Sequence, residues 1–167
     1  MSGAPRRPRL WKPVLVAAGS AMLVAVLGAL MTDLGPWYRN LAQPAWKPPD
    51  AAFGPIWTTI FALAAAAGVR GWRHARSRDD RERMLLLFAV NAFLNVFWSL
   101  LYFRLHRPDW SLVEVPFLWL SVLALIWLFT RFDKLAAWLL VPYLVWVSIA
   151  AVLNWETIRL NGPFGAS

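Results

Sequence analysis

The sequence contains no cysteine and only two histidines, and these absences exclude several kinds of chemistry. Without cysteine there can be no disulfide, no thiolate metal site and no cysteine nucleophile. His74 and His106 lie in the segments between apolar runs, so a buried haem with histidine or cysteine ligation is not expected. A P-loop and a hydrolytic triad are missing too. We therefore expect no metal, no cofactor and no conventional catalytic residues.

Charged residues are also scarce, at 16% of the chain against about a quarter in soluble domains. Hydrophobic residues make up 59%, and the mean hydropathy is +0.49. Crossing a hydrocarbon core takes roughly 20 apolar residues in a helix. Five runs meet this requirement, at residues 14–31, 53–69, 84–103, 112–130 and 135–155. The sequence predicts an all-α membrane protein, a five-transmembrane-helix bundle that forms one domain over residues 1–167.

The net charge of +8 is carried by the loops that flank the apolar runs. Anionic headgroups account for such residues, and nucleic acid is not an expected partner because no soluble module exists to bind it. One side of the predicted bundle carries Arg6, Arg7, Arg9, Lys12, Arg70, Arg73, Arg76, Arg78, Arg81, Arg83, Arg131 and Lys134. The other side carries Arg39, Lys47, Arg104, Arg107 and Arg159. This asymmetry predicts a multi-pass integral membrane protein with a cytoplasmic N-terminus, and leaves inner or outer membrane open.

The N-terminal apolar run, residues 14–31, follows several arginines as in a signal peptide. It is longer than the usual apolar core of about 7–15 residues, and no A-x-A cleavage site follows it. We therefore expect a retained first helix. Alanines at four-residue spacing (Ala17, Ala21, Ala25 and Ala29) would let another helix approach closely, within one bundle or in a dimer.

The first connection, residues 32–52, is rich in proline and in aromatic residues. Proline fixes φ and cannot continue a helix, so the segment should be extended or turned. Aromatic side chains favour the membrane interface. The loop is either a cap across the helix ends or an ordinary interfacial aromatic belt.

Polar and indole side chains inside the predicted spans are the candidate functional groups. Asn91, Asn95 and Ser99 share one helix face, which either forms interhelical hydrogen bonds or lines a ligand cavity. Tryptophan occurs twelve times. Those well inside the spans are Trp57, Trp98, Trp119, Trp127 and Trp146. Indoles that line a cavity would suit a large, flat, apolar ligand such as a planar macrocycle or a sterol.

Several spaced motifs resemble the tryptophan-rich sensory protein/translocator protein family (TspO/MBR). The matching residues are Trp37-Tyr38, Leu41, Pro44, Trp46, Pro48-Pro49, Phe53-Gly54-Pro55-x-Trp57-Thr58, Asn91-x-x-x-Asn95-x-x-Trp98-Ser99, Trp138-x-x-x-Pro142-Tyr143-x-x-Trp146, Leu153-Asn154 and Arg159-Leu160-Asn161. The match covers nearly the whole chain. One departure is Trp155, which stands where the family's proposed sterol motif has tyrosine.

The resemblance implies a five-helix bundle, a homodimer, and a pocket that opens under the first loop. Family members bind porphyrins such as protoporphyrin IX and benzodiazepine-type ligands, and animal members bind cholesterol. Carried over by motif, the ligand-binding residues are Trp37, Tyr38, Pro48, Trp57, Phe61, Asn95, Trp98, Trp146, Ala150 and Leu153. Three functions stay open: a porphyrin sensor or transporter, a light-dependent porphyrin-degrading enzyme that uses Trp57 and Trp146, and a sterol- or lipid-binding membrane scaffold.

Overall fold

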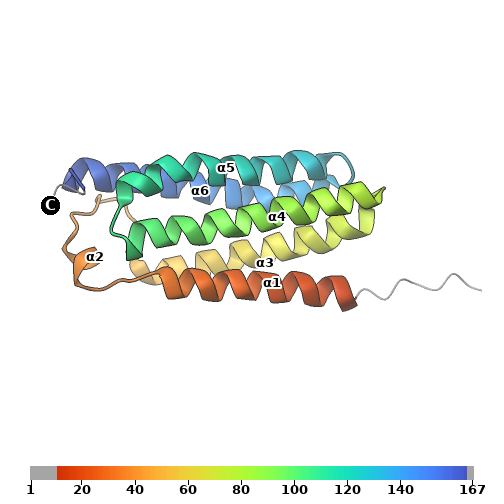
Figure 1. Cartoon of the computed structure of the whole chain (residues 1–167), viewed down its shortest axis with the longest axis horizontal. Coiled ribbons are helices and arrows are strands. Elements are labelled where there is room, and N and C mark those ends of the chain that lie inside the picture. The colour runs from red at the N-terminus through yellow and green to blue at the C-terminus, as the bar shows by residue number, and fades with distance from the viewer. Residues whose placement is uncertain (1–10, 165–167) are drawn as a thin grey trace, which may run out of the picture.

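A computed structural model describes residues 11–164, and every regular element in that part of the chain is a helix (Figure 1). The elements are α1 (Trp11–Met31), α2 (Pro36–Asn40), α3 (Asp50–His74), α4 (Arg78–Ser99) with a π-helical turn (Leu100–Arg104), α5 (Pro108–Thr130) and α6 (Lys134–Asn161). The five long helices are each apolar and long enough to cross a membrane. The predicted all-α, five-helix membrane fold is therefore confirmed.

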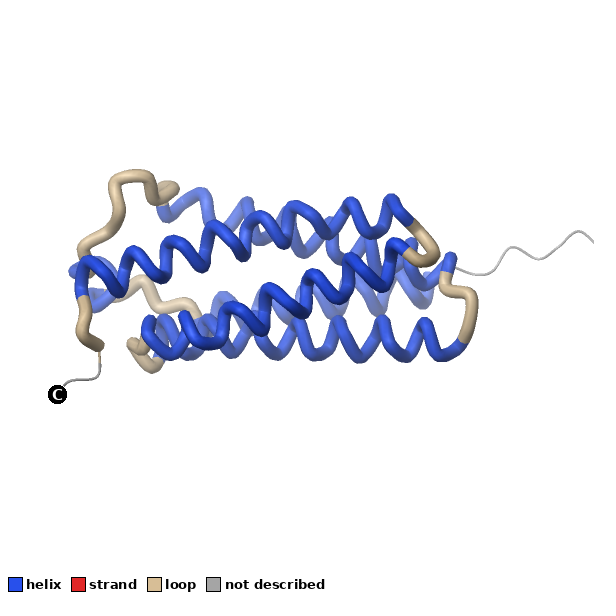
Figure 2. Tube along the Cα trace, turned by 90° about the horizontal axis from the view of Figure 1, so that it is seen from above, coloured by secondary structure: helices blue, strands red, loops and turns tan. Residues whose placement is uncertain are grey.

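The five long helices form a ring, in the order α1, α3, α6, α5, α4 (Figures 1 and 2). The most extensive packing is between α5 and α6, while α3 and α4 hardly touch although they are consecutive in the chain. α1 lies across the gap between α3 and α4, and none of its side chains is buried. The ring is therefore tightly packed on its α5–α6 side and loosely covered on its α1 side.

The helix boundaries extend past the apolar runs because polar groups cap and solvate the ends. The Ser77 hydroxyl accepts the Asp80 amide at 3.0 Å and begins α4. The Asp133 carboxylate accepts the amides of Leu135 and Ala136 at 2.9 and 3.2 Å and begins α6. Such capping satisfies amides that have no partner inside the helix. The three N-terminal arginines that entered the orientation argument lie outside the described residues, so the orientation stays a prediction.

Buried apolar side chains form two clusters, one at each half of the bundle. At the end that holds the α3–α4 and α5–α6 turns, Phe129, Leu125 and Met84 are central. In the half nearer the first loop, Val122, Val147 and Trp146 are central. The second cluster contains the candidate functional residues.

The first connection is partly helical, which corrects the expectation of an extended or turned segment. Pro36 occupies the first turn of α2, where a missing amide hydrogen costs nothing and the fixed φ suits a helix. The prolines at 116 and 142 lie inside continuous helices. α3 likewise begins at Asp50 and continues through Pro55. Proline is therefore tolerated inside three of the long helices.

Candidate functional site

A cluster of aromatic rings from α3 and α6 lies in the half of the bundle nearer the first loop. The Trp57 ring stacks on Phe61 with a centroid distance of 5.3 Å. It meets Trp146 edge-on at 6.4 Å and Tyr143 edge-on at 6.1 Å. Phe53 packs on the other side of Trp146, at 5.6 Å. We call these five residues the aromatic cluster.

A buried hydrogen-bond network joins this cluster to α4. The Asn95 side-chain amide donates to the Tyr143 hydroxyl at 3.1 Å, and this hydroxyl donates to the Asn91 carbonyl at 3.0 Å. Asn91 in turn donates to the Ser121 hydroxyl at 2.9 Å. Asn95 is 5% exposed and Asn91 is 6% exposed. Of the two roles expected for this polar face, Asn95 has that of an interhelical hydrogen-bond donor. Asn91 has both roles, because it makes interhelical hydrogen bonds and also lines a cavity described below.

A second aromatic group is built on the π-helical turn that ends α4. Tyr102 stacks on Trp98 at 5.1 Å and meets Trp37 of α2 edge-on at 6.2 Å. Tyr38 lies 5.6 Å from Phe103. A π-helical turn shifts the side chains that follow it, and such turns are frequent at functional sites. Here it places Tyr102 and Phe103 between α4 and the first loop.

The first loop is fixed over the bundle end by side chains from α6 and α3. The Asn161 amide accepts from the Ala42 backbone at 2.7 Å and donates back to it at 2.8 Å. The Tyr38 hydroxyl donates to Asp50 at 2.9 Å, and Lys47 pairs with the same carboxylate. Burial, together with the Asp50 carboxylate, raises the pKa of Tyr38. The loop therefore caps the helix ends and is not merely an interfacial belt.

Two indole N–H groups at this site have no acceptor. The Nε1 atoms of Trp98 and Trp146 are buried, and among the described residues neither has a hydrogen-bond partner. Trp146 is only 7% exposed. An unpaired buried donor costs about 1–3 kcal/mol. A ligand with a suitably placed acceptor would recover this energy.

The other residues predicted for the site are less engaged. Leu153 is buried, and Ala150 and Pro48 are half-buried. Trp127 points outward, with the Arg131 guanidinium 3.8 Å from its ring centroid, and Trp119 donates to Ser148 on an exposed face. These two indoles do not join the aromatic cluster.

Sequence reasoning did not select three residues that hold the site together. Tyr143 belongs to a quoted motif but was not assigned a ligand-binding role, although it contacts Trp57 and Asn95. Asn161 also belongs to a quoted motif but was assigned no role, and Tyr102 was not singled out. Their role depends on the π-helical turn and on a contact between residues 42 and 161, and neither feature has a periodic signal in the sequence.

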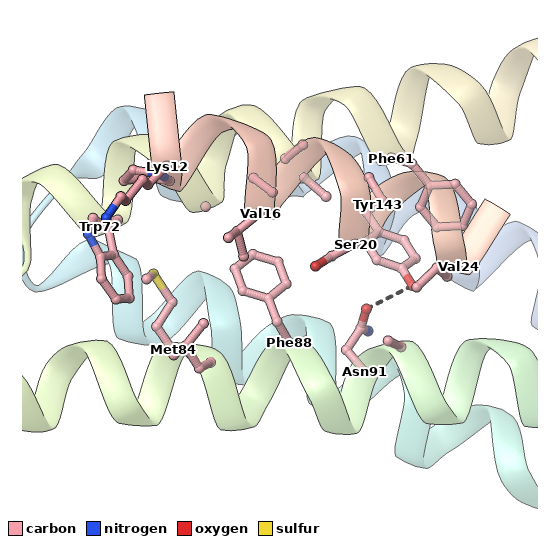
Figure 3. A pocket seen from close by; sticks show the side chains of 18 residues that line it. Lys12, Val16, Ser20, Val24, Phe61, Trp72, Met84, Phe88, Asn91 and Tyr143 are labelled. Atoms are coloured by element: carbon pink, nitrogen blue, oxygen red, sulfur yellow. Dashed lines mark hydrogen bonds between the residues drawn. The ribbon is translucent and has the colours of Figure 1, made fainter. Parts of the chain in front are cut away.

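A cavity of about 590 Å³ lies elsewhere, between α1, α3 and α4 (Figure 3). Among the ten predicted ligand-binding residues only Phe61 lines it. Ala17 and Ala21 of the alanine stripe also line it, so this part of the stripe faces the bundle interior. The cavity therefore differs from the predicted pocket under the first loop.

Fold and site together define a five-helix integral membrane protein with an aromatic site beneath a proline-rich cap. The sequence model of the TspO/MBR family matches residues 14–160, and the chain belongs to this family. The chain is similar to the tryptophan-rich protein TspO of Chlorobaculum tepidum, with 38% identity over 75% of this chain and 79% of that protein. The tryptophan-rich sensory protein of Cereibacter sphaeroides is 32% identical over 90% and 92% of the two chains. The translocator protein of Sus scrofa is 30% identical over 89% and 92%.

Proposed function

We propose that this protein binds a flat tetrapyrrole of the protoporphyrin type at the aromatic cluster, under the first loop, and acts as a porphyrin sensor or transporter. The observation that carries the proposal is the unpartnered indole N–H of Trp146 inside a group of aromatic rings. Ring faces and edges supply stacking area, while the indole donor selects a ligand that presents an acceptor.

The residues around Trp146 match both parts of such a ligand. The Trp57 ring is perpendicular to the Trp146 ring, and Phe61 and Tyr143 pack against Trp57 and against each other, which gives the apolar part of a ligand several ring surfaces. A macrocycle would replace ring–ring contacts within the cluster by ring–ligand contacts of similar area. The ammonium of Lys47 lies 5.5 Å from the Phe53 ring centroid, and Phe53 packs on Trp146. Lys47 also pairs with Asp50, so a ligand carboxylate at the edge of the macrocycle would compete with Asp50 for this ammonium.

The test is a titration of the purified full-length protein with protoporphyrin IX in the dark, in which binding is monitored by the absorption spectrum of the porphyrin. Trp146→Phe keeps an aromatic ring, smaller than the indole, and removes the donor, so affinity should fall at least about two- to tenfold, the equivalent of one hydrogen bond. Trp127→Phe is the matched control, because Trp127 is 59% exposed and lies outside the cluster. We expect the control to bind like the wild type.

Two outcomes would contradict the proposal. Wild-type protein whose porphyrin signal rises linearly without saturation would show only partitioning into detergent. An equal loss of affinity in Trp146→Phe and Trp127→Phe would remove the site from the aromatic cluster. Repeating the titration under light addresses the degradation hypothesis, because a new absorbing product that Trp146→Phe fails to form would favour an enzyme.

A separate variant tests whether the first loop retains the bound porphyrin. Asn161→Leu removes both hydrogen bonds to Ala42 and should loosen the cap, so porphyrin dissociation should become faster. Arg159→Gln is the control on the same helix end, since Arg159 pairs with Glu156 at the surface and makes no hydrogen bond to the first loop within the described residues. Unchanged dissociation in Asn161→Leu would show that the cap does not retain the ligand.

A further inference from the structure

The cavity between α1, α3 and α4 lies toward the end of the bundle opposite the first loop (Figure 3). Its volume of about 590 Å³ falls within the range of small-molecule sites. The lining is almost entirely apolar, with Val16, Ala64, Met84 and Phe88 as typical members. An apolar occupant is therefore required.

The cavity is long in the direction of α1. It is lined from Lys12 to Val24, and at 1.5 Å per residue this is roughly 18 Å. One leaflet of a bilayer has a hydrocarbon depth of about 15 Å, half of the usual core. The length therefore matches one acyl chain of a membrane lipid lying along the helices.

One side of the cavity is open to the surface that faces lipid. The side chains of Val16, Ser20 and Leu85 line it and are exposed, and Figure 3 shows Ser20 directed into the space between α1 and α4. α1 packs less extensively on α4 than on α3, and it has no buried residue. An acyl chain can therefore enter laterally from the bilayer.

The mouth of the cavity is positively charged. Lys12 lies at the same end as Trp72, and in the described part of the chain no carboxylate lies within 4.0 Å of the Lys12 ammonium (Figure 3). The Arg81 guanidinium lies 5.1 Å from the Trp72 ring centroid, and Arg73 and Arg76 follow in the same turn region. A cationic end on an apolar groove is complementary to an anionic headgroup attached to a chain.

We propose that this cavity binds one acyl chain of an anionic phospholipid, whose phosphate is held at Lys12. Phe61 and Tyr143 form the inner end of the cavity and also belong to the aromatic cluster, so they separate the two sites. The lipid site therefore does not depend on the proposed tetrapyrrole site, and either can fail without the other.

The test is native mass spectrometry of the full-length protein from detergent, with added phosphatidylglycerol or phosphatidylcholine of the same acyl chains. The wild type should retain one phosphatidylglycerol in preference to phosphatidylcholine. Ala21→Leu puts a larger side chain into the cavity and should abolish retention of either lipid. Ala18→Leu is the matched control, because Ala18 is exposed and does not line the cavity, and it should retain lipid like the wild type.

A second pair of variants tests the headgroup. Lys12→Gln should reduce retention of phosphatidylglycerol about fivefold, the effect of one basic residue near an anionic lipid, and leave phosphatidylcholine unchanged. Lys134→Gln removes the same charge at the same bundle end, outside the cavity, and should have no such effect. If Ala21→Leu does not fold, the comparison of Lys12→Gln with Lys134→Gln alone decides whether the cavity binds an anionic phospholipid.

Three results would overturn the proposal. One is equal retention of the two lipids by the wild type. Another is an equal loss in Lys12→Gln and Lys134→Gln. The third is complete displacement of phosphatidylglycerol by equimolar free fatty acid of the same chain length, which would identify the fatty acid as the occupant. Porphyrin titration of the same variants should be unchanged, which separates this site from the aromatic cluster.

Discussion

The substitution Tyr143→Phe removes one hydroxyl that serves two buried amides. The Tyr143 hydroxyl accepts from Asn95 at 3.1 Å and donates to Asn91 at 3.0 Å. After its removal the Asn95 amide loses its acceptor, and the Asn91 carbonyl loses its donor. Both asparagines are at least nine-tenths buried, and the cavity that Asn91 lines is almost entirely apolar, so water is a poor replacement for the lost hydroxyl.

The size of the effect follows from the bonds lost. Hydrogen bonds between membrane helices are worth about 0.6 kcal/mol on average and up to about 2 kcal/mol. Two lost bonds therefore give about 1–3 kcal/mol. For a chain of this length 1 kcal/mol corresponds to about 2–4 °C in Tm, so we expect Tyr143→Phe to lower Tm by about 3–10 °C.

Tyr102→Phe is the matched control, because it deletes the same atom elsewhere in the core. The Tyr102 hydroxyl donates to the Thr157 hydroxyl at 3.1 Å. Thr157 itself donates to the Leu153 carbonyl at 2.9 Å, so it keeps a partner when Tyr102 is changed. Tyr102→Phe should lower Tm by about half as much, about 1–5 °C, the effect of one lost bond.

The assay is thermal unfolding in detergent, followed by far-ultraviolet circular dichroism. Asn95→Leu added to Tyr143→Phe removes one unpaired amide, and the double variant should recover part of the lost Tm. Equal Tm changes in Tyr143→Phe and Tyr102→Phe would refute the reasoning, because it depends on the number of buried groups left without a partner.

Two further predictions concern the other half of the bundle. A Cβ at Gly71 would lie 2.9 Å from the buried ring of Phe129, so Gly71→Ala should destabilise the fold by about 1–3 kcal/mol. The higher helix propensity of alanine offsets at most about 1 kcal/mol of this loss. Gly19→Ala is the control because the space around Gly19 is open, and equal thermal stabilities of the two variants would contradict the prediction. Burial alone would raise the pKa of Asp133, but the Ala136 amide, Arg70 and His74 outweigh it and lower that pKa below its usual 3.8. The folded state therefore binds fewer protons than the unfolded state near this pKa. The contribution of the Asp133 carboxylate to the free energy of unfolding should be full above about pH 4 and should disappear as the pH falls through the pKa of the folded state. A plot of Tm against pH should show this loss for the wild type and not for Asp133→Asn.

Hydropathy could predict the five spans because lipid requires every spanning helix to be apolar for about 20 residues. The central positions of Trp57 and Trp146 were predicted by the family resemblance, because position inside a span did not distinguish them from Trp119 and Trp127, which lie outside the aromatic cluster. The helix ends were less predictable. Capping side chains such as Ser77 and Asp133 lie outside the apolar runs, and their effect depends on local geometry.

The large cavity was not predictable from the sequence. Its walls are ordinary apolar residues such as Val16, Met84 and Phe88, which hydropathy cannot distinguish from lipid-facing ones. The cavity exists because α3 and α4 diverge and α1 covers the gap loosely, which is a property of the ring arrangement. The alanine stripe was the single sequence signal for it, and that signal favoured packing within the bundle but left a dimer contact open.

Phe61 and Tyr143 lie between the two proposed sites, and we expect them to keep a ligand in one site away from a ligand in the other. Phe61 and Tyr143 face the cavity, and both contact Trp57 or each other in the aromatic cluster. Tyr143 cannot rotate away without breaking its bonds to Asn91 and Asn95. A lipid chain in the cavity and a ligand in the cluster therefore meet opposite sides of a wall that is fixed by buried hydrogen bonds. Weakening that wall by Tyr143→Phe should make the two occupants compete, whereas in the wild type they should bind independently.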